Sequence, residues 1–333
     1  VLREVTAERL AEAATIFSTR DALWFQQRRT LGQSGQSMQG NAYFTAPNPP
    51  HGAVFTYHLS EGLTSLQQER KASEKELEDD EDVPFPGWDA LEAERTESGP
   101  KIWLTIRDNA GNVVRRITGP GSKGFHRVAW DLRGPSTSVI SAGSGASASA
   151  SGYVSPPGSY TVELSKQVRG IVTDLAGPVS FNVVPLYSGA LPGAAPDDIA
   201  AFGKEIDEVM NAAAMLSSDL GDAMDKVESM GAALGRSTLA PGDLDARLDA
   251  MRQALLTLRR QANGTPSMGQ VGEKQPPTFM SRIGRARGGT SNWTYGPTAA
   301  HRENLQIGRS EFHIWREAVN LALDTMLPAL EQA

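Results

Sequence analysis

The feature that most constrains the fold of this chain is a change in the spacing of its apolar residues. Between residues 51 and 187 apolar side chains alternate with polar ones, whereas beyond residue 197 they recur every three or four positions. The first period is typical of half-buried antiparallel strands and the second of amphipathic helices. The sequence therefore predicts a β-rich region followed by a helical region.

The β-rich region, residues 51–187, consists of short alternating runs separated by turn signals. In residues 101–107, for example, Ile102, Leu104 and Ile106 share one face, and similar runs follow to residue 183. The segment 108–112 links two runs as a hairpin, because Gly111 adopts a positive φ readily. About seven short strands over this length are typical of a β-sandwich, which we predict here.

Two insertions interrupt the predicted sandwich. In the first, residues 61–98, the stretch from Glu69 to Asp82 contains eight acidic and three basic residues, so its net charge of −5 is most of the chain's −7. We interpret it as a solvated helix that ends in an acidic tail, since the Gly-containing spacing of a calcium loop is absent. A surface for a cation or a basic partner is the alternative. The second insertion, residues 136–155, is Ser/Gly-rich and predicts a flexible surface loop.

The helical region, residues 188–333, predicts a bundle of three long helices with a long loop at residues 263–297. The helices extend over about residues 197–234, 244–263 and 298–331. The loop contains the chain's one basic–aromatic cluster, whose members are Arg282, Arg285, Arg287, Trp293 and Tyr295. This cluster is a candidate site for an anion, a sugar or a partner strand, because aromatic rings stack on sugars and arginines pair with carboxylates. The alternative is a loop packed across the bundle or the sandwich, with its arginines paired to acidic residues.

The N-terminal segment, residues 1–50, predicts a mostly helical entry followed by irregular chain. Thr6 is suited to cap a helix that continues to Phe17. The apolar cluster Leu23, Trp24 and Phe25 then has no obvious partner in the segment. We therefore expect a linker that packs on a neighbour, with these three residues as a candidate docking segment.

Composition and motifs point away from catalysis. The chain has no cysteine, which excludes disulfides and thiolate chemistry, and its pI near 5.4 argues against nucleic acid as a partner. No apolar run approaches the roughly 20 residues of a membrane span. The five histidines lack metal-binding spacing, and no nucleophile elbow, phosphate loop or dinucleotide fingerprint is present. We predict no catalytic residue, metal, cofactor or enzymatic activity for this chain.

Three stretches of the β-rich region resemble a known module. They are GAVFTYHL at residues 52–59, LTIRDNAGNVVRRITGPGSKGFHRVAWDLR at 104–133 and VSPPGSYTVEL at 154–164. Together they resemble the FlgD-like or fibronectin-III-like immunoglobulin (Ig-like) domain. Residues 19–333, including PPTFMSRIGR near residue 280, resemble the C-terminal region of large exported bacterial proteins with sortilin-like, BNR-repeat β-propellers, often labelled glycosyl-hydrolase-like.

This resemblance implies an Ig-like sandwich and a helical domain that carry no active site. The chain contains no propeller repeat, so a hydrolytic label would belong to an upstream propeller. The implied function is a structural or interaction module that docks on a β-propeller domain or chain in an extracytoplasmic setting. The alternative is a carbohydrate-binding or glycoside-hydrolase accessory module that uses the Trp293/Tyr295/Arg loop to bind glycans. An outright hydrolase would need two carboxylates brought together from distant positions.

Overall fold

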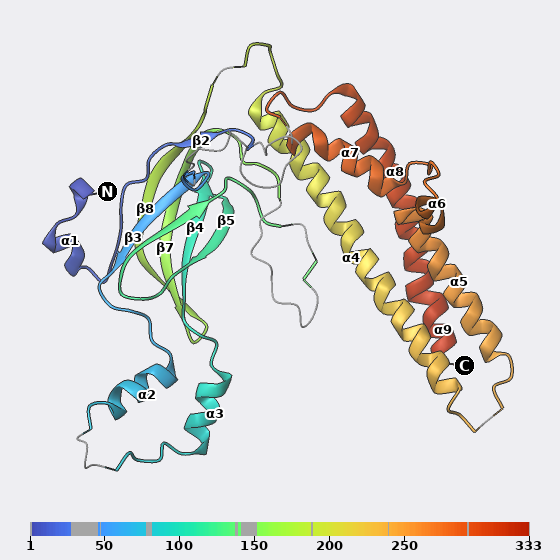
Figure 1. Ribbon diagram of the computed structural model, residues 1–333, viewed down its shortest axis with the longest axis horizontal. Coiled ribbons are helices and arrows are strands. Elements are labelled where there is room, and N and C mark those ends of the chain that lie inside the picture. The colour runs from blue at the N-terminus through green and yellow to red at the C-terminus, as the bar shows by residue number, and fades with distance from the viewer. Residues whose placement is uncertain are drawn as a thin grey trace, which may run out of the picture. The chain divides into compact units, whose positions relative to one another are not determined.

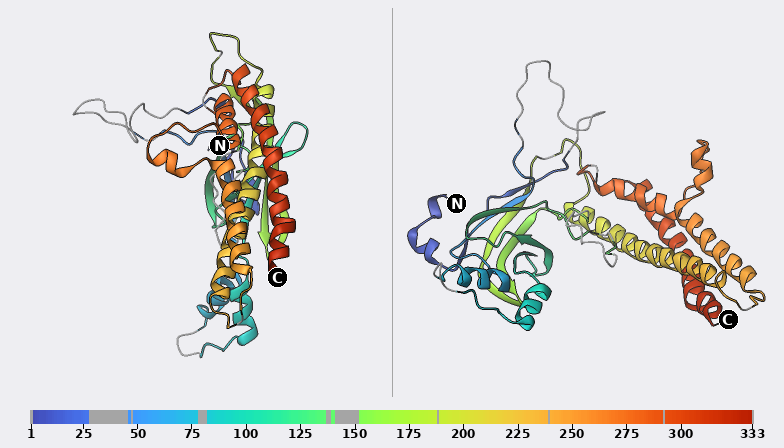
Figure 2. Two further views of the ribbon diagram at one scale, coloured as in Figure 1. Left: turned by 90° about the vertical axis from the view of Figure 1, so that its right-hand side faces the viewer. Right: turned by 60° about the horizontal axis from the view of Figure 1, so that its bottom comes forward.

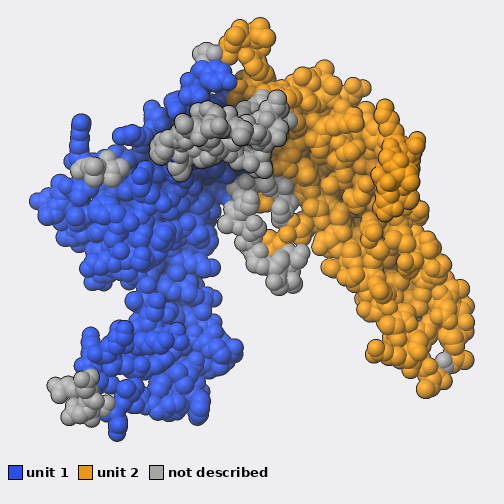
Figure 3. Space-filling view, viewed as in Figure 1, with its two compact units in different colours: residues 1–134, 155–188 blue, residues 135–154, 189–333 orange. Residues whose placement is uncertain are grey.

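The computed structural model divides the chain into two compact units. Unit 1 comprises residues 1–134 and 155–188, and unit 2 comprises residues 135–154 and 189–333 (Figure 3). Unit 1 contains β-strands with a few short helices, and the regular elements described in unit 2 are helices (Figure 1). The structure describes residues 2–27, 46, 48–77, 82–136, 139–140, 152–187, 189–238, 240–291 and 293–332. The chain is thus a multidomain protein of mixed α and β content.

Unit 1 contains two sheets. The three-stranded sheet has the order β1-β3-β6 and the five-stranded sheet the order β2-β8-β7-β4-β5. Neighbouring strands are antiparallel except β2 and β8, which are parallel. The strands are β1 (Ala14–Ile16), β2 (Ala22–Trp24), β3 (Ala53–Leu59), β4 (Lys101–Asp108), β5 (Val113–Gly119), β6 (Gly124–Trp130), β7 (Gly158–Val168) and β8 (Ile171–Pro185).

Aromatic side chains join the two sheets in one core. Phe55 of β3 meets Phe181 of β8 edge to face, with ring centroids 5.3 Å apart, and Trp130 of β6 meets Tyr160 of β7 at 5.4 Å. Such edge-to-face pairs add to the stabilisation that burial of the rings already provides. The core therefore forms from the alternating faces that the sequence displays.

The hairpin predicted around residues 108–112 is confirmed. β4 and β5 pair antiparallel from Ile102 opposite Gly119 to Arg107 opposite Val113. At the turn, the carboxylate of Asp108 accepts hydrogen bonds from the N–H groups of Ala110 (3.0 Å) and Asn112 (2.9 Å). Gly111 has a φ of +83°, the conformation for which glycine was expected at this position.

The prediction of a helical, linker-like N-terminal segment is wrong for residues 14–24. Helix α1 (Ala7–Ala11) ends early, β1 then pairs with β3, and β2 pairs with β8. Phe17 is fully buried and Trp24 nearly so. These residues complete the sheets of unit 1, so they are part of its core. Residues 28–45 and 47 of the predicted linker lie outside the described part of the chain.

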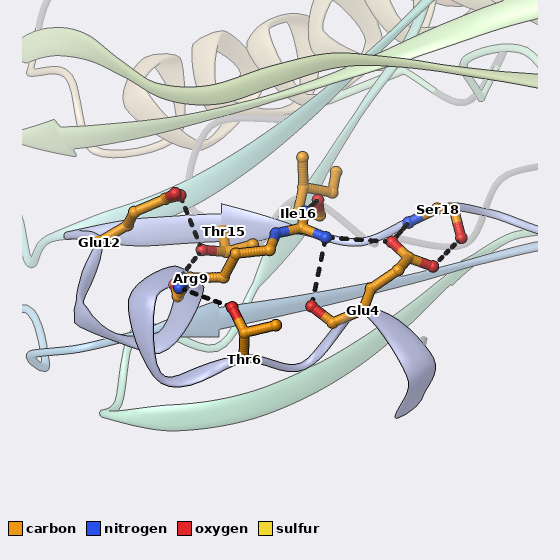
Figure 4. A network of polar contacts seen from close by, with 7 residues as sticks. All are labelled: Glu4, Thr6, Arg9, Glu12, Thr15, Ile16 and Ser18. Carbon is orange, nitrogen blue, oxygen red and sulfur yellow. Dashed lines mark hydrogen bonds and ion pairs between the residues drawn. The ribbon is translucent and has the colours of Figure 1, made fainter.

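A polar network fastens the start of the chain to β1 (Figure 4). Glu4, at the end of the short 3-10 helix η1 (Leu2–Glu4), accepts hydrogen bonds from the hydroxyl and the N–H of Ser18 and from Arg9. Arg9 also donates to the carbonyl of Ile16 at 3.1 Å. The hydrogen bonds from Ser18, helped by Arg9, lower the pKa of Glu4 to about 2.

The charged insertion forms a helical hairpin, α2 (Leu66–Glu74) and α3 (Trp88–Thr96), which lies beyond the ends of the strands (Figure 1). We call residues 61–98 the α2–α3 hairpin; of these, residues 78–81 lie outside the described part of the chain. Neither helix buries a single side chain. Arg70 of α2 instead pairs with Glu94 of α3 at 2.6 Å and with Glu74. The predicted solvated helix is confirmed at α2.

The second unit is built around long helices that pack along one another (Figure 2). The predicted helices are confirmed as elements, although the last is interrupted by one π-helical turn, η2. The segment predicted as a long loop, residues 263–297, contains the helices α6 and α7, so that prediction is wrong for residues 266–270 and 279–291. The helices are α4 (Pro196–Leu234), α5 (Leu244–Asn263), α6 (Pro266–Gln270), α7 (Phe279–Ser291), α8 (Ala299–Leu321), η2 (Ala322–Met326) and α9 (Leu327–Glu331).

The core of unit 2 explains why α7 forms despite its three glycines. Phe279 and Ile283 of α7 are buried, and the ring of Phe279 lies 5.1 Å from that of Trp315 on α8. A Cβ at Gly308 of α8 would come within 3.0 Å of the Ile283 side chain, so this glycine permits the close approach of the two helices. Tertiary packing therefore outweighs the weak intrinsic helix propensity of the segment.

The Ser/Gly-rich insertion, residues 136–155, falls largely outside the described residues. Its described end, near Tyr153, belongs to unit 2. The Tyr153 N–H donates to the carboxylate of Asp207 on α4 at 2.6 Å, and a Cβ at Gly203 would meet the Tyr153 side chain at 3.0 Å. The returning chain is thus held against α4.

Candidate functional site

An open concavity lies in unit 2, between α5 and α8. It consists of two adjoining pockets of about 450 and 380 Å³, and Ala318 of α8 lines both. We call the two together the α5–α8 groove. Both pockets are open to solvent, and both are lined mainly by apolar surface. Clefts between packed helices are a common place for ligands and partner segments.

Small side chains form the floor of the second pocket, and large apolar ones stand exposed beside the groove. Ala254 of α5, Ala318 of α8 and Ala322 of η2 line it. Ile314 is 71% exposed and Leu321, two turns further along α8, is 59% exposed. A small-residue floor lets another backbone approach closely, and exposed apolar side chains at i and i+7 present one continuous stripe on the helix.

A π-helical turn places the far wall of the groove. In η2 the N–H of Leu327 donates to the carbonyl of Ala322, five residues back. Met326, at the end of this turn, lines the second pocket and is 43% exposed. Single π-helical turns occur frequently at functional sites, because the extra residue shifts the side chains that follow it. Methionine also adapts its shape to a partner more readily than branched side chains do.

At the other end of the groove, polar side chains lie beside two aromatic ones. Phe279 and Trp315 line it, with the Trp315 indole N–H donating to the Leu258 carbonyl at 2.9 Å. Glu311 and Arg260 contribute one charge of each sign. The Glu311 carboxylate lies 3.3 Å from the Arg282 guanidinium, and Arg260 donates to Thr257 of its own helix. This end of the groove therefore offers a partner for a charged group of either sign.

Gly264 shapes the wall where α5 ends. Its φ is +84°, and its N–H donates to the Arg260 carbonyl at 2.7 Å. A Cβ at this position would lie 2.3 Å from the side-chain oxygen of Gln275, which accepts the Thr265 N–H at 2.7 Å. The helix end at Asn263 and Gly264 was expected from the sequence, but the groove was not.

The structure separates the three arginines predicted as a cluster. Arg282 faces α8 and pairs with Glu311, while Arg285 is exposed on the same helix. Arg287 directs its guanidinium to the sulfur of Met210 on α4 at 3.5 Å. The chain therefore does not present them as one basic surface.

The two aromatic residues of the predicted cluster pack after the end of α7. The Trp293 indole N–H donates to the Gly296 carbonyl at 3.2 Å, and its ring lies 5.8 Å from that of His301. Tyr295 is partly exposed, and its backbone carbonyl accepts the Ala194 N–H at 2.9 Å. Among the predicted residues, only Arg282 touches a residue of the groove.

The predicted docking segment in unit 1 is also divided by the structure. Trp24 is buried, Leu23 is exposed, and the Phe25 ring meets that of His51 edge to face at 4.8 Å. Burial lowers the pKa of His51; nearby Asp131 opposes this shift and Arg133 adds to it. The His51 Nδ1 atom has no hydrogen-bond partner among the described residues.

The described part of the chain holds no group of three or more His, Cys, Asp or Glu residues placed to bind a metal ion. None of its described helices has the length and apolar character needed to cross a membrane.

The groove residues were missed because each looks ordinary in the sequence. The apolar stripe of residues 299–331 predicts a core-facing helix, and Ile314 and Leu321 lie off that stripe between charged residues. Two apolar residues seven positions apart on the polar face are only a weak indication of a binding surface. Their exposure becomes evident only when the position of the helix in the structure is known.

Comparison with known proteins identifies no relative. No family model, no curated protein and no solved structure matches the chain.

Proposed function

We propose that this chain is a non-catalytic interaction module of an exported β-propeller protein, composed of an Ig-like β-sandwich and a bundle of long helices. The propeller partner and the extracytoplasmic setting rest on the resemblance of residues 19–333 to the C-terminal regions of such proteins. The sandwich is supported by two sheets of mainly antiparallel strands that share an aromatic core. In the helical unit α7 packs beside the three long helices of this proposal.

The observation that carries the interaction role is the α5–α8 groove. Exposed Ile314 and Leu321 beside a floor of alanines are unfavourable in water unless a second apolar surface covers them. The groove geometry suits a single helix or extended segment, which would insert its own apolar side chains between α5 and α8. The polar end at Arg260 and Glu311 would then fix the direction of that segment.

Charging the rim of the groove tests this proposal. We expect the full chain, used as bait in extracts of its native source, to retain a propeller-containing polypeptide identified by mass spectrometry. The variant Ile314→Lys/Leu321→Lys should lose that polypeptide, because two ammonium groups cannot be buried in an apolar interface without a large desolvation cost. Met215→Lys is the matched control, since Met215 is an exposed apolar residue on α4.

Four outcomes are informative. Loss of the propeller polypeptide with the groove variant alone supports the proposal. Equal retention by all three proteins would contradict a role for the groove. A captured partner without a propeller would contradict the propeller assignment, and groove-dependent dimers of the purified chain would replace it with self-association.

The carbohydrate-binding alternative is less well supported by the geometry. It requires Trp293, Tyr295 and the arginines on one accessible face, whereas Trp293 packs on His301 and the arginines point to different neighbours. Calorimetric titration with glycans checks this alternative. Binding that disappears in Trp293→Ala would favour it over the interaction module.

A further inference from the structure

The tip of the α2–α3 hairpin in unit 1 carries a second apolar surface of a different kind. Phe85 is 62% exposed and Trp88 is 78% exposed, and their rings meet edge to face with centroids 5.1 Å apart. Val83, also exposed, precedes them. Large aromatic side chains rarely remain this accessible, and contiguous ones mark binding surfaces more often than single ones. We call Val83, Phe85 and Trp88 the aromatic tip.

The aromatic tip is not needed to hold the hairpin together. Neither α2 nor α3 buries a residue, and the contact between them is the pair of Arg70 with Glu94. Helix α2 also has a capping box, in which Ser65 and Gln68 satisfy each other's backbone N–H groups. Ion pairing and capping therefore account for the hairpin, and the two rings contribute only a contact with each other.

The backbone nevertheless holds the tip in a defined place. Pro84 and Pro86 restrict the backbone on either side of Phe85, and Gly87 precedes α3 with a φ of +89°. At the base of the hairpin, the Leu66 N–H donates to Glu97 at 2.8 Å. Arg169, in the turn between β7 and β8, reaches Glu69 (3.1 Å) and Glu97 (3.5 Å). The rings are thus presented on an anchored support, which lowers the entropy cost of binding a partner.

The charge around the tip decides what kind of partner fits it. Residues 61–98 contain thirteen acidic and four basic residues, a net charge of −9, out of 39 and 32 in the whole chain. The remaining 295 residues therefore carry a net charge of +2. The basic side chains Arg70 and Arg95 are already paired with glutamates of the hairpin. The hairpin is thus the acidic part of an otherwise nearly neutral chain, and it attracts cations and repels anionic surfaces.

We propose that the aromatic tip binds an arginine-containing basic segment of a partner protein. A guanidinium group stacks on the face of Trp88 or Phe85, and the net negative charge of the hairpin attracts the neighbouring positive charges of the segment. Arginine fits better than lysine because its planar, weakly hydrated head group stacks on aromatic rings at a smaller desolvation cost. Anionic membranes and nucleic acids are excluded by repulsion, and a neutral glycan would gain nothing from the acidic surroundings.

Fluorescence anisotropy with labelled model peptides tests the proposal on the full chain. We expect (Arg-Gly)6 to bind, (Lys-Gly)6 to bind more weakly and (Glu-Gly)6 not to bind. Phe85→Ala/Trp88→Ala should weaken the binding of (Arg-Gly)6 about two- to fivefold, the size of a cation–π contribution at an exposed site. Asp82→Asn/Asp89→Asn, which keeps both rings, should weaken binding less and make it less sensitive to salt.

The control is Tyr187→Ala, which removes an equally exposed ring from another part of unit 1. It should bind (Arg-Gly)6 as the unchanged protein does. Because every substituted side chain is exposed, the circular dichroism spectra should be identical, which separates loss of binding from loss of folding. If the arginine and lysine peptides bind equally well, and if binding persists without both rings, the hairpin acts only as a nonspecific acidic surface. That result would overturn the proposal, as would the absence of any peptide binding at low salt.

Discussion

The N-terminal segment and the α2–α3 hairpin of unit 1 both lie outside the clearly alternating part of the sequence, yet they relate to the fold in opposite ways. Residues 2–25 bury Phe17 and Trp24 and supply one strand to each sheet. The hairpin buries no side chain in its helices and leaves Phe85 and Trp88 in solvent. Aromatic residues in the first region therefore stabilise the fold, and those in the second are available to a partner.

Deleting residues 1–25 should have the largest effect on the stability of unit 1. Both sheets would lose an edge strand, and the core residues beneath them would become exposed, so we expect unit 1 to lose its cooperative unfolding. Replacing residues 66–96 with a short Gly/Ser linker should leave that transition in place, since Leu66 and Glu97 adjoin at the base of the hairpin. Differential scanning calorimetry of both variants makes the comparison. A folded unit 1 after the N-terminal deletion would show that residues 14–24 are an accessory to the sheets.

A single substitution sharpens the same comparison. Phe17→Ala should lower the free energy of unfolding of unit 1 by about 3–5 kcal/mol, because it removes a fully buried ring and leaves a cavity. Phe85→Ala removes the same kind of side chain from the exposed tip, and it should change the free energy of unfolding by less than about 0.5 kcal/mol. Urea unfolding followed by near-ultraviolet circular dichroism measures both. Similar losses in the two variants would contradict the contrast.

A smaller effect is expected at the polar network of Figure 4. Glu4→Gln removes the charge that Ser18 and Arg9 bind and should cost about 1 kcal/mol, because the site is partly exposed. The pKa of Glu4 is lowered from 4.5 to about 2, so its contribution is present above pH 4.5 and is lost as the pH falls toward 2. The difference in stability between the two proteins should therefore shrink across that interval. A difference that is constant with pH would rule out the ionised carboxylate as its origin.

The smallest effect on stability is expected from breaking the ion pairs within the α2–α3 hairpin. Arg70→Ala breaks the pairs with Glu94 and Glu74, in which the side chains of Arg70 and Glu74 are partly exposed and that of Glu94 is largely buried. We expect faster hydrogen exchange in α2 and α3 without a change in the exchange of β3 and β4. Lys71→Ala, at the next position of α2, is the matched control. Faster exchange throughout the sheets would mean that the hairpin supports the core.

Sequence patterns predict the parts of this fold whose periodicity is long and local. The hairpin of β4 and β5 has clear alternation and a turn with Gly111, and α4, α5 and α8 have apolar stripes over many turns. The three-residue strands β1 and β2 are too short to show alternation. They form because Ile16 pairs with Tyr57 and Leu23 with Val184, partners that are distant in the chain. Such pairing is a tertiary property, and local propensity does not reveal it.

The candidate site is less predictable than the fold. The arginines of residues 282–287 look like a cluster in the sequence, but a helix turns Arg282 and Arg287 toward different neighbours. The groove depends instead on side chains that the sequence presents as unremarkable, such as Ala318 and Ala322. Of the two surfaces proposed to bind partners, the acidic insertion is distinctive in the sequence by its charge, whereas the exposure of its rings is visible only in the structure.

The most direct test of the central claim compares folding with binding at the exposed apolar side chains. Ile314→Lys/Leu321→Lys, beside the α5–α8 groove, should unfold in urea within about 0.5 kcal/mol of the unchanged protein while losing the propeller polypeptide. Phe312→Ala, on the buried face of the same helix, should lose about 3–5 kcal/mol. A groove variant that is as destabilised as Phe312→Ala, or one that retains its partner, would contradict the account.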